Sequence, residues 1–265
     1  MLIKPYIKMT VNILNYLAFR VSTFFGIKRL PVYFNGQWVR LSLESWPGFY
    51  KVYEPYMAEA IKEHLTTGNV FIDVGAHFGL WSVFATTLVG DRGTVIACEP
   101  SEAFEVLVKN LPNGSRKALR IGVGASDTMG SFFGQGKAMS GSFYSRVTEL
   151  NIKYHPDIPI IENTVPIRSL DSLMSELKLH PDVIKVDVEG FEYKVLQGAF
   201  QLLRSESPIM IIEVHPPQLK LSGDSEEQLL ALLAESGYSV KIIDRNPNSL
   251  YTILAKGKSK IGLTA

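Results

Sequence analysis

Short apolar runs and amphipathic stretches alternate along most of the chain. The apolar runs have the length of buried strands, and they predict strands at residues 70–74, 94–98, 119–123, 182–188, 208–214, 238–243 and 250–255. The stretches between them carry apolar residues at helical spacing and predict helices at residues 80–89, 101–110, 169–177, 191–203 and 225–236. Because strands that alternate with helices form a mainly parallel sheet with helices on both faces, the expected fold class is α/β.

The chain that precedes this alternation has a different pattern. Residues 1–28 look helical, and residues 32–41 alternate around an Asn-Gly pair, which is a strong signal for a β-hairpin. A further helix is predicted over residues 54–65. We therefore expect a helical and hairpin extension over residues 1–52, followed by one domain over residues 53–258.

Residues 128–163 interrupt the rhythm of strands and helices. This stretch is rich in Gly and Ser at first and then carries Tyr144, Arg146, Tyr154 and His155. It is long for a connection inside a compact domain, and such insertions are often lids or substrate-binding elements. The alternative is an extra hairpin or a surface loop without a function.

Composition excludes several classes of protein. Hydrophobic residues make up 46% of the chain, which is enough for a sizeable core, and the net charge of +1 gives no general attraction to nucleic acid. Cys98 is the single cysteine, so no internal disulfide can form and a cytoplasmic location is expected. Cys98 lies in an apolar strand, where a small buried side chain is a better interpretation than a nucleophile.

The N-terminal part is basic and apolar. No acidic residue precedes Glu44, whereas several Lys and Arg residues do, and apolar residues lie between them. The longest uncharged run of this part, residues 9–19, is too short to span a bilayer. Residues 1–28 could therefore lie on an anionic membrane surface as a peripheral helix. The alternative, which we favour, is a helix packed on the domain or on a partner in a homo-oligomer.

Residues 70–79 carry the first signal of a binding site. An apolar strand ends near Asp73, and Gly75 and Gly79 follow before the next helix. Glycine allows a tight turn and a close approach of the backbone to a ligand. The G-x-G-x-x-G pattern of dinucleotide binders is not met, because His77 and Leu80 take the second and third glycine positions. This favours a cofactor without a pyrophosphate, such as S-adenosylmethionine (SAM).

An acid follows at the end of the next strand. Glu99 comes about 20 residues after the glycine loop, at the tip of the strand over residues 94–98. A carboxylate at this place can accept hydrogen bonds from both ribose hydroxyls of an adenosine ligand. Together with the glycine loop, Glu99 predicts an adenosine-containing cofactor.

A second group of polar residues follows two later strands. Asp187 and Glu189 come at the end of one strand, and Glu213 and His215 at the end of the next. The carboxyl ends of parallel strands share one edge of a sheet, so these residues should meet near the glycine loop. His215 is a candidate base for removing a proton from a hydroxyl during methyl transfer.

Several roles stay open for the acids of this group. They could orient His215, bind a sugar hydroxyl or hold a divalent ion through oxygen ligands, although no metal is predicted. Alternatively, some of them cap helix N-termini, and His215 is a structural histidine.

The chain resembles the FkbM family of SAM-dependent methyltransferases. The motifs that carry this resemblance are Tyr53-Glu54-Pro55, residues 71–76, Gly79, Cys98-Glu99-Pro100, residues 170–173, residues 184–192 and residues 212–215. The resemblance implies a Rossmann-like class I methyltransferase fold with a seven-stranded sheet whose last strand is antiparallel. It also implies O-methylation, commonly of a sugar hydroxyl on a glycan or glycolipid, or of a natural product.

The resemblance further implies a set of site residues. Asp73, Gly75 and Gly79 would surround the methionyl part of SAM, and Glu99 would hold the ribose. The other positions implied for the cofactor are Glu54, His77, Pro100, Ser101, Ser126 and Asp187, and those implied for the acceptor are Asp187 and Glu189. His77 departs from the family, which usually has Asn at this position, although a neutral imidazole can also donate and accept.

Two alternatives remain at the level of the sequence. The first is an oxidoreductase that uses NAD, against which the missing second glycine argues. The second is a non-catalytic, membrane-associated protein that binds SAM, for which the basic N-terminus and His77 give some support. The acceptor should be selected by the first 50 residues and by residues 128–163, which match nothing in the family pattern.

Overall fold

A computed structural model describes residues 28–45, 53–111, 114, 116–136, 141–152, 156–245 and 250–257. The predicted N-terminal helix therefore lies outside the described residues except for Lys28. Tyr154 and His155 of the predicted insertion lie outside them as well.

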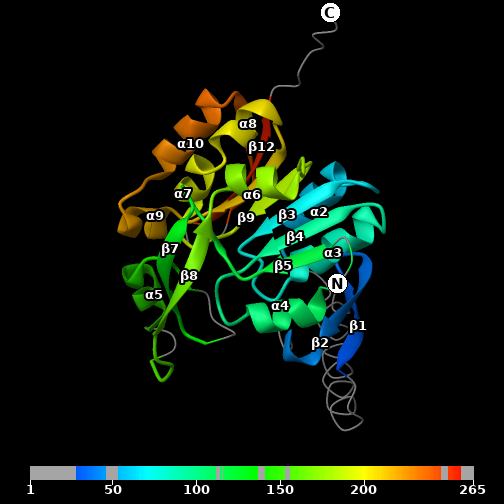
Figure 1. Ribbon diagram of the computed structural model, residues 1–265, viewed down its shortest axis with the longest axis horizontal. Coiled ribbons are helices and arrows are strands. Elements are labelled where there is room, and N and C mark those ends of the chain that lie inside the picture. Colours follow the sequence, from blue (N-terminus) through cyan, green and yellow to red (C-terminus); the bar gives the residue numbers. More distant parts are fainter. Residues whose placement is uncertain are drawn as a thin grey trace, which may run out of the picture.

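The centre of the molecule is a seven-stranded sheet (Figure 1). Its strand order is β11 (Tyr238–Arg245), β12 (Tyr251–Gly257), β10 (Ile209–Val214), β9 (Val183–Val186), β3 (Val70–Val74), β4 (Thr94–Cys98) and β5 (Arg116–Leu119). β12 is antiparallel to β10 and β11, and the other neighbouring strands pair in parallel. The expected α/β fold, with seven strands and an antiparallel last strand, is confirmed.

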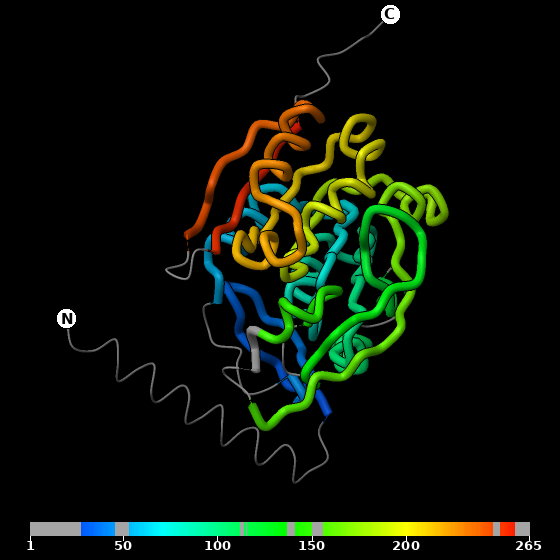
Figure 2. Tube along the Cα trace, turned by 90° about the vertical axis from the view of Figure 1, so that its left-hand side faces the viewer, coloured from blue at the N-terminus to red at the C-terminus, as the bar shows by residue number. Residues whose placement is uncertain are grey.

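Helices cover both faces of the sheet, as Figures 1 and 2 show. Ile72 and Val74 of β3 face one layer, and Phe71 faces the other, because side chains alternate along a strand. The first layer contains α6 (Leu170–Leu177), α7 (Glu192–Gln197), α8 (Phe200–Ser205), α9 (Pro216–Ser222) and α10 (Glu226–Glu235). The second contains α2 (Pro55–His64), α3 (Leu80–Val89) and α4 (Phe104–Asn110).

A β-hairpin packs against the second layer. It consists of β1 (Arg29–Phe34) and β2 (Gln37–Ser42), followed by the short helix η1 (Leu43–Ser45). Asn35 and Gly36 form the turn with φ angles of 43° and 89°, which confirms the predicted hairpin. Phe34 is fully buried, with its ring 5.3 Å from that of Trp81, so the hairpin and α3 share one core. The proposed domain boundary after residue 52 stays a prediction.

The chain leaves the main sheet sooner than the sequence predicts. The single strand predicted over residues 119–123 is wrong: β5 ends at Leu119, and β6 (Gly122–Val123) belongs to a second sheet. In that sheet β8 (Ile161–Arg168) pairs with β6 in parallel and with β7 (Thr128–Gly134) in antiparallel fashion. Figure 1 shows β7, β8 and the intervening α5 (Ser145–Ile152) beside the main sheet.

The helix predicted over residues 191–203 is two helices. Asp171 causes the break, because its carboxylate accepts hydrogen bonds from the N–H groups of Gln201 (3.0 Å) and Leu202 (2.8 Å) and so caps α8. Gly198 lies at the break, where a Cβ would stand only 1.9 Å from the carbonyl oxygen of Gly124. Contacts that are distant in sequence thus set this boundary.

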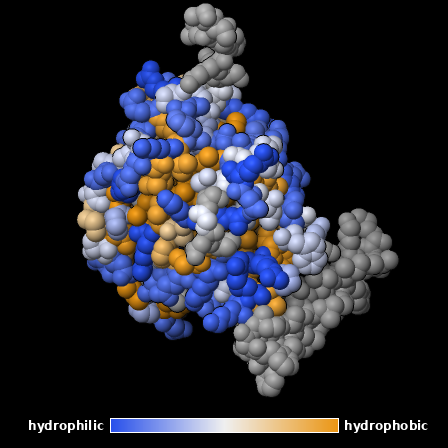
Figure 3. Space-filling view, turned by 45° about the vertical axis from the view of Figure 1, so that its right-hand side comes forward, coloured by the Kyte–Doolittle hydropathy of each residue, from blue (hydrophilic) through white to orange (hydrophobic). Residues whose placement is uncertain are grey.

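The surface is mainly hydrophilic, with apolar side chains gathered on the middle of the face that Figure 3 shows. Within the described ranges, the helices are all too short or too polar to cross a membrane.

Candidate active site

A cavity of about 250 Å³ opens at the carboxyl ends of β3, β4 and β9. The strand order reverses between β3 and β9, and this is the place where open α/β sheets bind ligands. The predicted site residues that line the cavity are Glu54, Gly75, His77, Glu99, Pro100, Ser101, Asp187 and Glu189. Residues that are far apart in sequence therefore meet here, as the strand pattern predicted.

Two glycines shape the loop between β3 and α3. Gly75 has a φ of 75°, and a Cβ built on it would stand 1.8 Å from the carbonyl oxygen of Asp187. Gly79 has a φ of 77°, and its Cβ would stand 2.4 Å from Leu107 Cδ1. Gly75 allows the loop to touch the end of β9, whereas Gly79 packs on α4 and is not among the lining residues.

Glu99 links the two loops at one side of the cavity. Its Oε2 accepts a hydrogen bond from the N–H of His77 (2.7 Å), and its Oε1 accepts one from the N–H of Ser101 (2.8 Å). The residue is only 5% exposed. Each carboxylate oxygen has a second lone pair, so Glu99 can still accept from hydroxyl groups of a ligand.

Three lining residues adopt a backbone conformation that is uncommon for residues other than glycine. Glu54, His77 and Glu189 have φ angles of 40°, 49° and 49°. Asn, Asp and His are the residues that tolerate this region best, which explains why a His can stand where the family usually has Asn. Such strained residues often cluster at functional sites.

Lys185 lies beneath the loop and was not predicted as a site residue. Its Nζ donates to the carbonyl oxygen of Gly75 (3.0 Å) and lies 3.2 Å from Asp73 Oδ1 and 3.5 Å from Asp187 Oδ2. Burial alone would lower the pKa of Lys185, but Asp73 and Asp187 raise it above the ordinary value. The sequence signal is a lysine inside the apolar run of β9.

Asp73 lies behind the cavity wall. It is fully buried, its Oδ2 accepts a hydrogen bond from Ser82 Oγ (2.6 Å), and it is not among the lining residues. Asp73 therefore acts on the cavity through Lys185 and the shape of the loop.

His215 is held by the buried side chain of Glu192, which was not among the predicted site residues. Its Nδ1 lies 2.7 Å from Glu192 Oε1, and both side chains are buried. Its Nε2 lies 3.6 Å from Glu189 Oε2 and 3.9 Å from Asp187 Oδ1. Burial lowers the pKa of His215, but Glu192 together with Glu189 and Asp187 raises it well above 6.5. The surrounding carboxylates and the burial of the ring thus act on this pKa in opposite directions, and the carboxylates prevail.

Glu213 lies in the same group of charges. Burial, followed by the nearby Asp187, raises the pKa of Glu213 to about 8, although His215 acts in the opposite direction. Neither Glu213 nor His215 is among the lining residues, so both lie behind Asp187. Asp187 and Glu189 are therefore the members of this group that line the cavity.

The insertion also contributes to the cavity. Phe132, Gly141 and Phe143 line it, and the ring of Phe143 packs 4.8 Å from that of Phe191. Ser142 Oγ donates a hydrogen bond to the carbonyl oxygen of Glu189 (3.0 Å). The described residues of the insertion, which form β7, α5 and the start of β8, thus contribute to the wall.

Ser126 takes a different position from the other predicted residues. It is exposed and is not among the residues that line the cavity. Its neighbour Asp127 accepts hydrogen bonds from Arg168 Nε (2.9 Å) and from the N–H of Ser169 (2.8 Å). The turn after β6 therefore tethers β8 to the start of α6.

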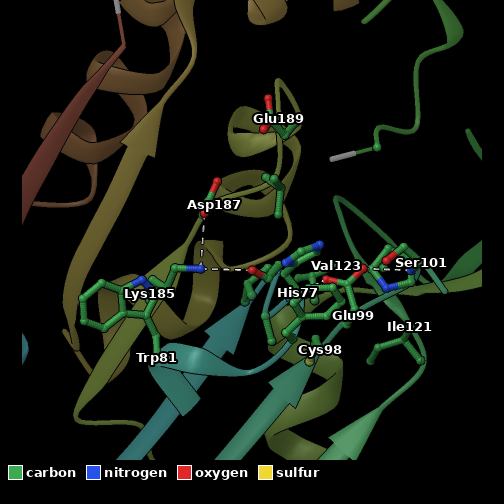
Figure 4. Close-up of a pocket in the computed structure, with 18 of the residues that line it drawn as sticks. His77, Trp81, Cys98, Glu99, Ser101, Ile121, Val123, Lys185, Asp187 and Glu189 are labelled. Atoms are coloured by element: carbon green, nitrogen blue, oxygen red, sulfur yellow. Dashed lines mark hydrogen bonds and ion pairs between the residues drawn. The ribbon is translucent and has the colours of Figure 1, made fainter. Parts of the chain in front are cut away.

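The cavity has two chemically different ends (Figure 4). Glu99 and Ser101 lie at one end, close to Ile121, and Lys185 and Asp187 lie at the other. The buried carboxylate of Glu99, beside apolar side chains, suits the adenosine of SAM. The acidic end suits the positive charges of SAM, which are its sulfonium and its ammonium group. The residues present therefore fit SAM.

Comparisons with known proteins support this chemistry. The family described as "Methyltransferase FkbM domain" matches residues 73–240. The hexuronic acid methyltransferase AglP of Haloferax volcanii is 24% identical over 195 residues, which are 72% of each chain.

Two solved structures match a large part of this chain. Methyltransferase FkbM from Methylobacillus flagellatus has 16% identity and a TM-score of 0.48, over 72% of this chain and 44% of that one. SMU.1697c from Streptococcus mutans, solved in complex with SAH, has 10% identity and a TM-score of 0.44, and the match covers 76% of this chain and 94% of that one. The assignment rests on the family match, which begins at the end of β3, includes the glycine loop and both acidic strand ends, and reaches into β11. We conclude that this chain belongs to the FkbM family of SAM-dependent methyltransferases.

Proposed function

We propose that the protein transfers a methyl group from SAM to a hydroxyl of a sugar, on a glycan, a glycolipid or a natural product. One observation carries the proposal: Asp187 and Glu189 line the same cavity as Glu99, but at the end opposite to it. An adenosine held by Glu99 would direct its sulfonium toward these two carboxylates. The acceptor hydroxyl would enter beside them.

The cofactor residues follow from this orientation. Glu99 would accept from the ribose hydroxyls, and Pro100 and Ser101 would lie along the adenosine together with Ile121 and Phe143. At the other end, Glu54 and Asp187 would attract the sulfonium and ammonium charges. Gly75 would let the backbone approach the methionyl part, and Asp73 would support it through Lys185.

The residues at the acidic end would prepare the acceptor. SAM supplies an activated methyl group, so that the acceptor C–O bond forms as the C–S bond breaks. Glu189 lines the cavity and would accept the hydroxyl proton, while Asp187 orients the hydroxyl. His215 and Glu213 lie behind them and would keep these carboxylates in place.

A sugar acceptor is supported by the relative AglP, whose name states that it methylates a hexuronic acid. The aromatic residues that the insertion brings to the cavity wall, Phe132 and Phe143, give an apolar face on which a sugar ring can pack.

Methyl-labelled SAM incubated with the full chain and a panel of glycans tests the proposal. Panels should contain hexuronic acids and neutral sugars. We expect label in the sugar that resists alkali, because a methyl ether is stable whereas a methyl ester on a uronic carboxyl is hydrolysed. Alkali-labile label would contradict O-methylation of a hydroxyl. Tighter binding of NADH than of SAM would favour an oxidoreductase, and SAM binding without transfer would favour a non-catalytic protein.

A matched pair of variants tests the assigned base. Glu189→Gln should lower turnover by about 100- to 10,000-fold with little change in the Kd for SAM. Glu235→Gln changes an exposed acid of α10 and should leave both unchanged. Turnover at the wild-type rate in Glu189→Gln would remove Glu189 from the mechanism.

A further inference from the structure

We propose that Asp187, Glu213 and His215 bind a divalent cation of the Mn²⁺ type at the wall of the cavity. The three residues come from the ends of β9 and β10, which are neighbours in the sheet. One ligand atom of each lies within 4.8 Å of the others. Because the sugar would approach the same wall, this inference rests in part on the proposed function.

One candidate ligand atom of each of the three residues lies close to those of the other two. Lys185 lies 3.5 Å from Asp187 Oδ2, which leaves Oδ1 facing His215 at 3.9 Å from Nε2. Two carboxylate oxygens and one imidazole nitrogen form a mixed set of hard and borderline ligands, which suits Mn²⁺ and related cations.

The environment of the imidazole adds a further observation. His215 is only 2% exposed, and its Nε2 lies 3.6 Å and 3.9 Å from the nearest carboxylate oxygens that it faces, too far for a hydrogen bond. Nε2 of this buried side chain thus faces the acidic group at ion-pair distance and makes no hydrogen bond with it. In the neutral imidazole, the lone pair of such a nitrogen can coordinate a metal ion that the neighbouring carboxylates also bind.

The second ring nitrogen of His215, Nδ1, contacts a carboxylate, as is usual for histidines that bind metal ions. Nδ1 is 2.7 Å from Oε1 of Glu192, which is fully buried. The same oxygen accepts a hydrogen bond from the N–H of Gly190 (3.0 Å), so Glu192 is itself fixed. A carboxylate that holds the second ring nitrogen sets the tautomer and the orientation of a metal ligand.

The local charge also favours a cation. Asp187, Glu189 and Glu213 come together around His215, and Lys185 Nζ lies 3.5 Å from Asp187 Oδ2 and 3.2 Å from Asp73 Oδ1. A divalent ion among these carboxylates would reduce their mutual repulsion. Because Asp187 lines the cavity and the other two lie behind it, open coordination positions would face the acceptor hydroxyl.

Titration of the EDTA-treated full chain with Mn²⁺, followed by electron paramagnetic resonance or calorimetry, tests the site without any turnover. We expect one saturable site in the wild type. Glu213→Gln and His215→Asn should each weaken it at least tenfold; the Asn amide can still donate to Glu192 but does not reach the position of Nε2. Glu192→Gln should weaken it about 10- to 100-fold. Glu235→Gln should leave the affinity unchanged.

Binding of SAM, measured on the same samples without metal, separates this inference from the proposed function. Thermal unfolding shows that each variant is folded. The absence of saturable Mn²⁺ binding, or equal affinity in the wild type, Glu213→Gln and His215→Asn, would overturn the metal site. Retained Mn²⁺ binding with no binding of SAM would leave the metal site standing and count against the methyltransferase proposal alone.

Discussion

Gly75 and Asp187 touch backbone to backbone, so that a Cβ on Gly75 would stand 1.8 Å from the carbonyl oxygen of Asp187. This contact joins the glycine loop after β3 to the acidic end of β9. It keeps the place of the cofactor and the place of the acceptor in one rigid arrangement.

Gly75→Ala should therefore be strongly destabilising. The new methyl group meets backbone that cannot turn away, and the φ of 75° is unfavourable for alanine, so we expect a loss of about 3 kcal/mol or more in the free energy of unfolding. Urea denaturation measures this loss. Gly68→Ala is the matched control, because Gly68 has a φ of 93° and no atom within 4 Å of its Cβ. It should cost only about 1–2 kcal/mol, and equal losses would mean that the contact does not matter.

His77 should accept replacement by Asn but not by a β-branched residue. At a φ of 49° the backbone suits Asn and His, whereas valine is strained there. We expect His77→Asn to stay within about 0.5 kcal/mol of the wild type and His77→Val to lose about 1–2 kcal/mol. Thermal unfolding and the Kd for SAM report both effects. A stable His77→Val variant would show that the loop relaxes.

Lys185→Met should leave a buried carboxylate without its cation. Lys185 and Asp73 are 2% and 0% exposed, and removal of one partner of a buried pair costs about 3–5 kcal/mol. Adding Asp73→Asn should recover a large part of this loss, because the uncompensated charge is then removed. Urea denaturation of the two single variants and the double variant gives the coupling between them. Additive losses would contradict the ion pair.

Glu99→Gln should weaken SAM binding and also lower stability, because one of the two backbone N–H groups loses its acceptor. An amide cannot accept from both backbone N–H groups and from ribose hydroxyls, and loss of a charged acceptor costs about 1.5–3 kcal/mol. The Kd for SAM should rise roughly 10- to 150-fold, as calorimetry can measure. Glu102→Gln, three residues further along, is the control and should bind as the wild type does. An unchanged Kd in Glu99→Gln would remove Glu99 from the ribose site.

Asp127 should make the free energy of unfolding depend on pH in the acidic range. Hydrogen bonds from Ser172 and from the N–H of Ser169, with help from Arg168, lower its pKa to about 2. A carboxyl whose pKa is lower in the folded state stabilises the protein above the unfolded value near 4, and this contribution disappears as the pH falls toward 2. Asp127 is partly exposed, so we expect roughly 1 kcal/mol after screening. Asp127→Asn should show a smaller loss of stability between pH 4 and 2 than the wild type. Identical pH profiles would contradict this.

Local sequence patterns predicted the parts of the site that depend on the chain near them. The glycine turn, the strand tips with Glu99 and Asp187, and the Asn35-Gly36 hairpin are encoded within a few residues, because turn chemistry and strand periodicity act locally. Their meeting at one edge followed from the rule that parallel strands share a carboxyl end.

Other features could not be read from neighbouring residues. Glu192 stands in the first turn of α7, and only its packing against His215 reveals that it fixes the ring. Lys185 lies in the apolar strand β9, and its role follows only from the positions of Asp73 and Asp187 near its ammonium group. Likewise, the break before α8 depends on Asp171, which lies in another helix.

The sequence by itself determined the α/β sheet, the cofactor loop and the family, because these depend on periodicity and on short motifs. The tertiary structure alone decided which charges are buried together, which residues of the insertion reach the cavity, and which carboxylates surround His215. The physical reason is that burial and the distances between charges set electrostatic energies, and both arise only when distant segments pack.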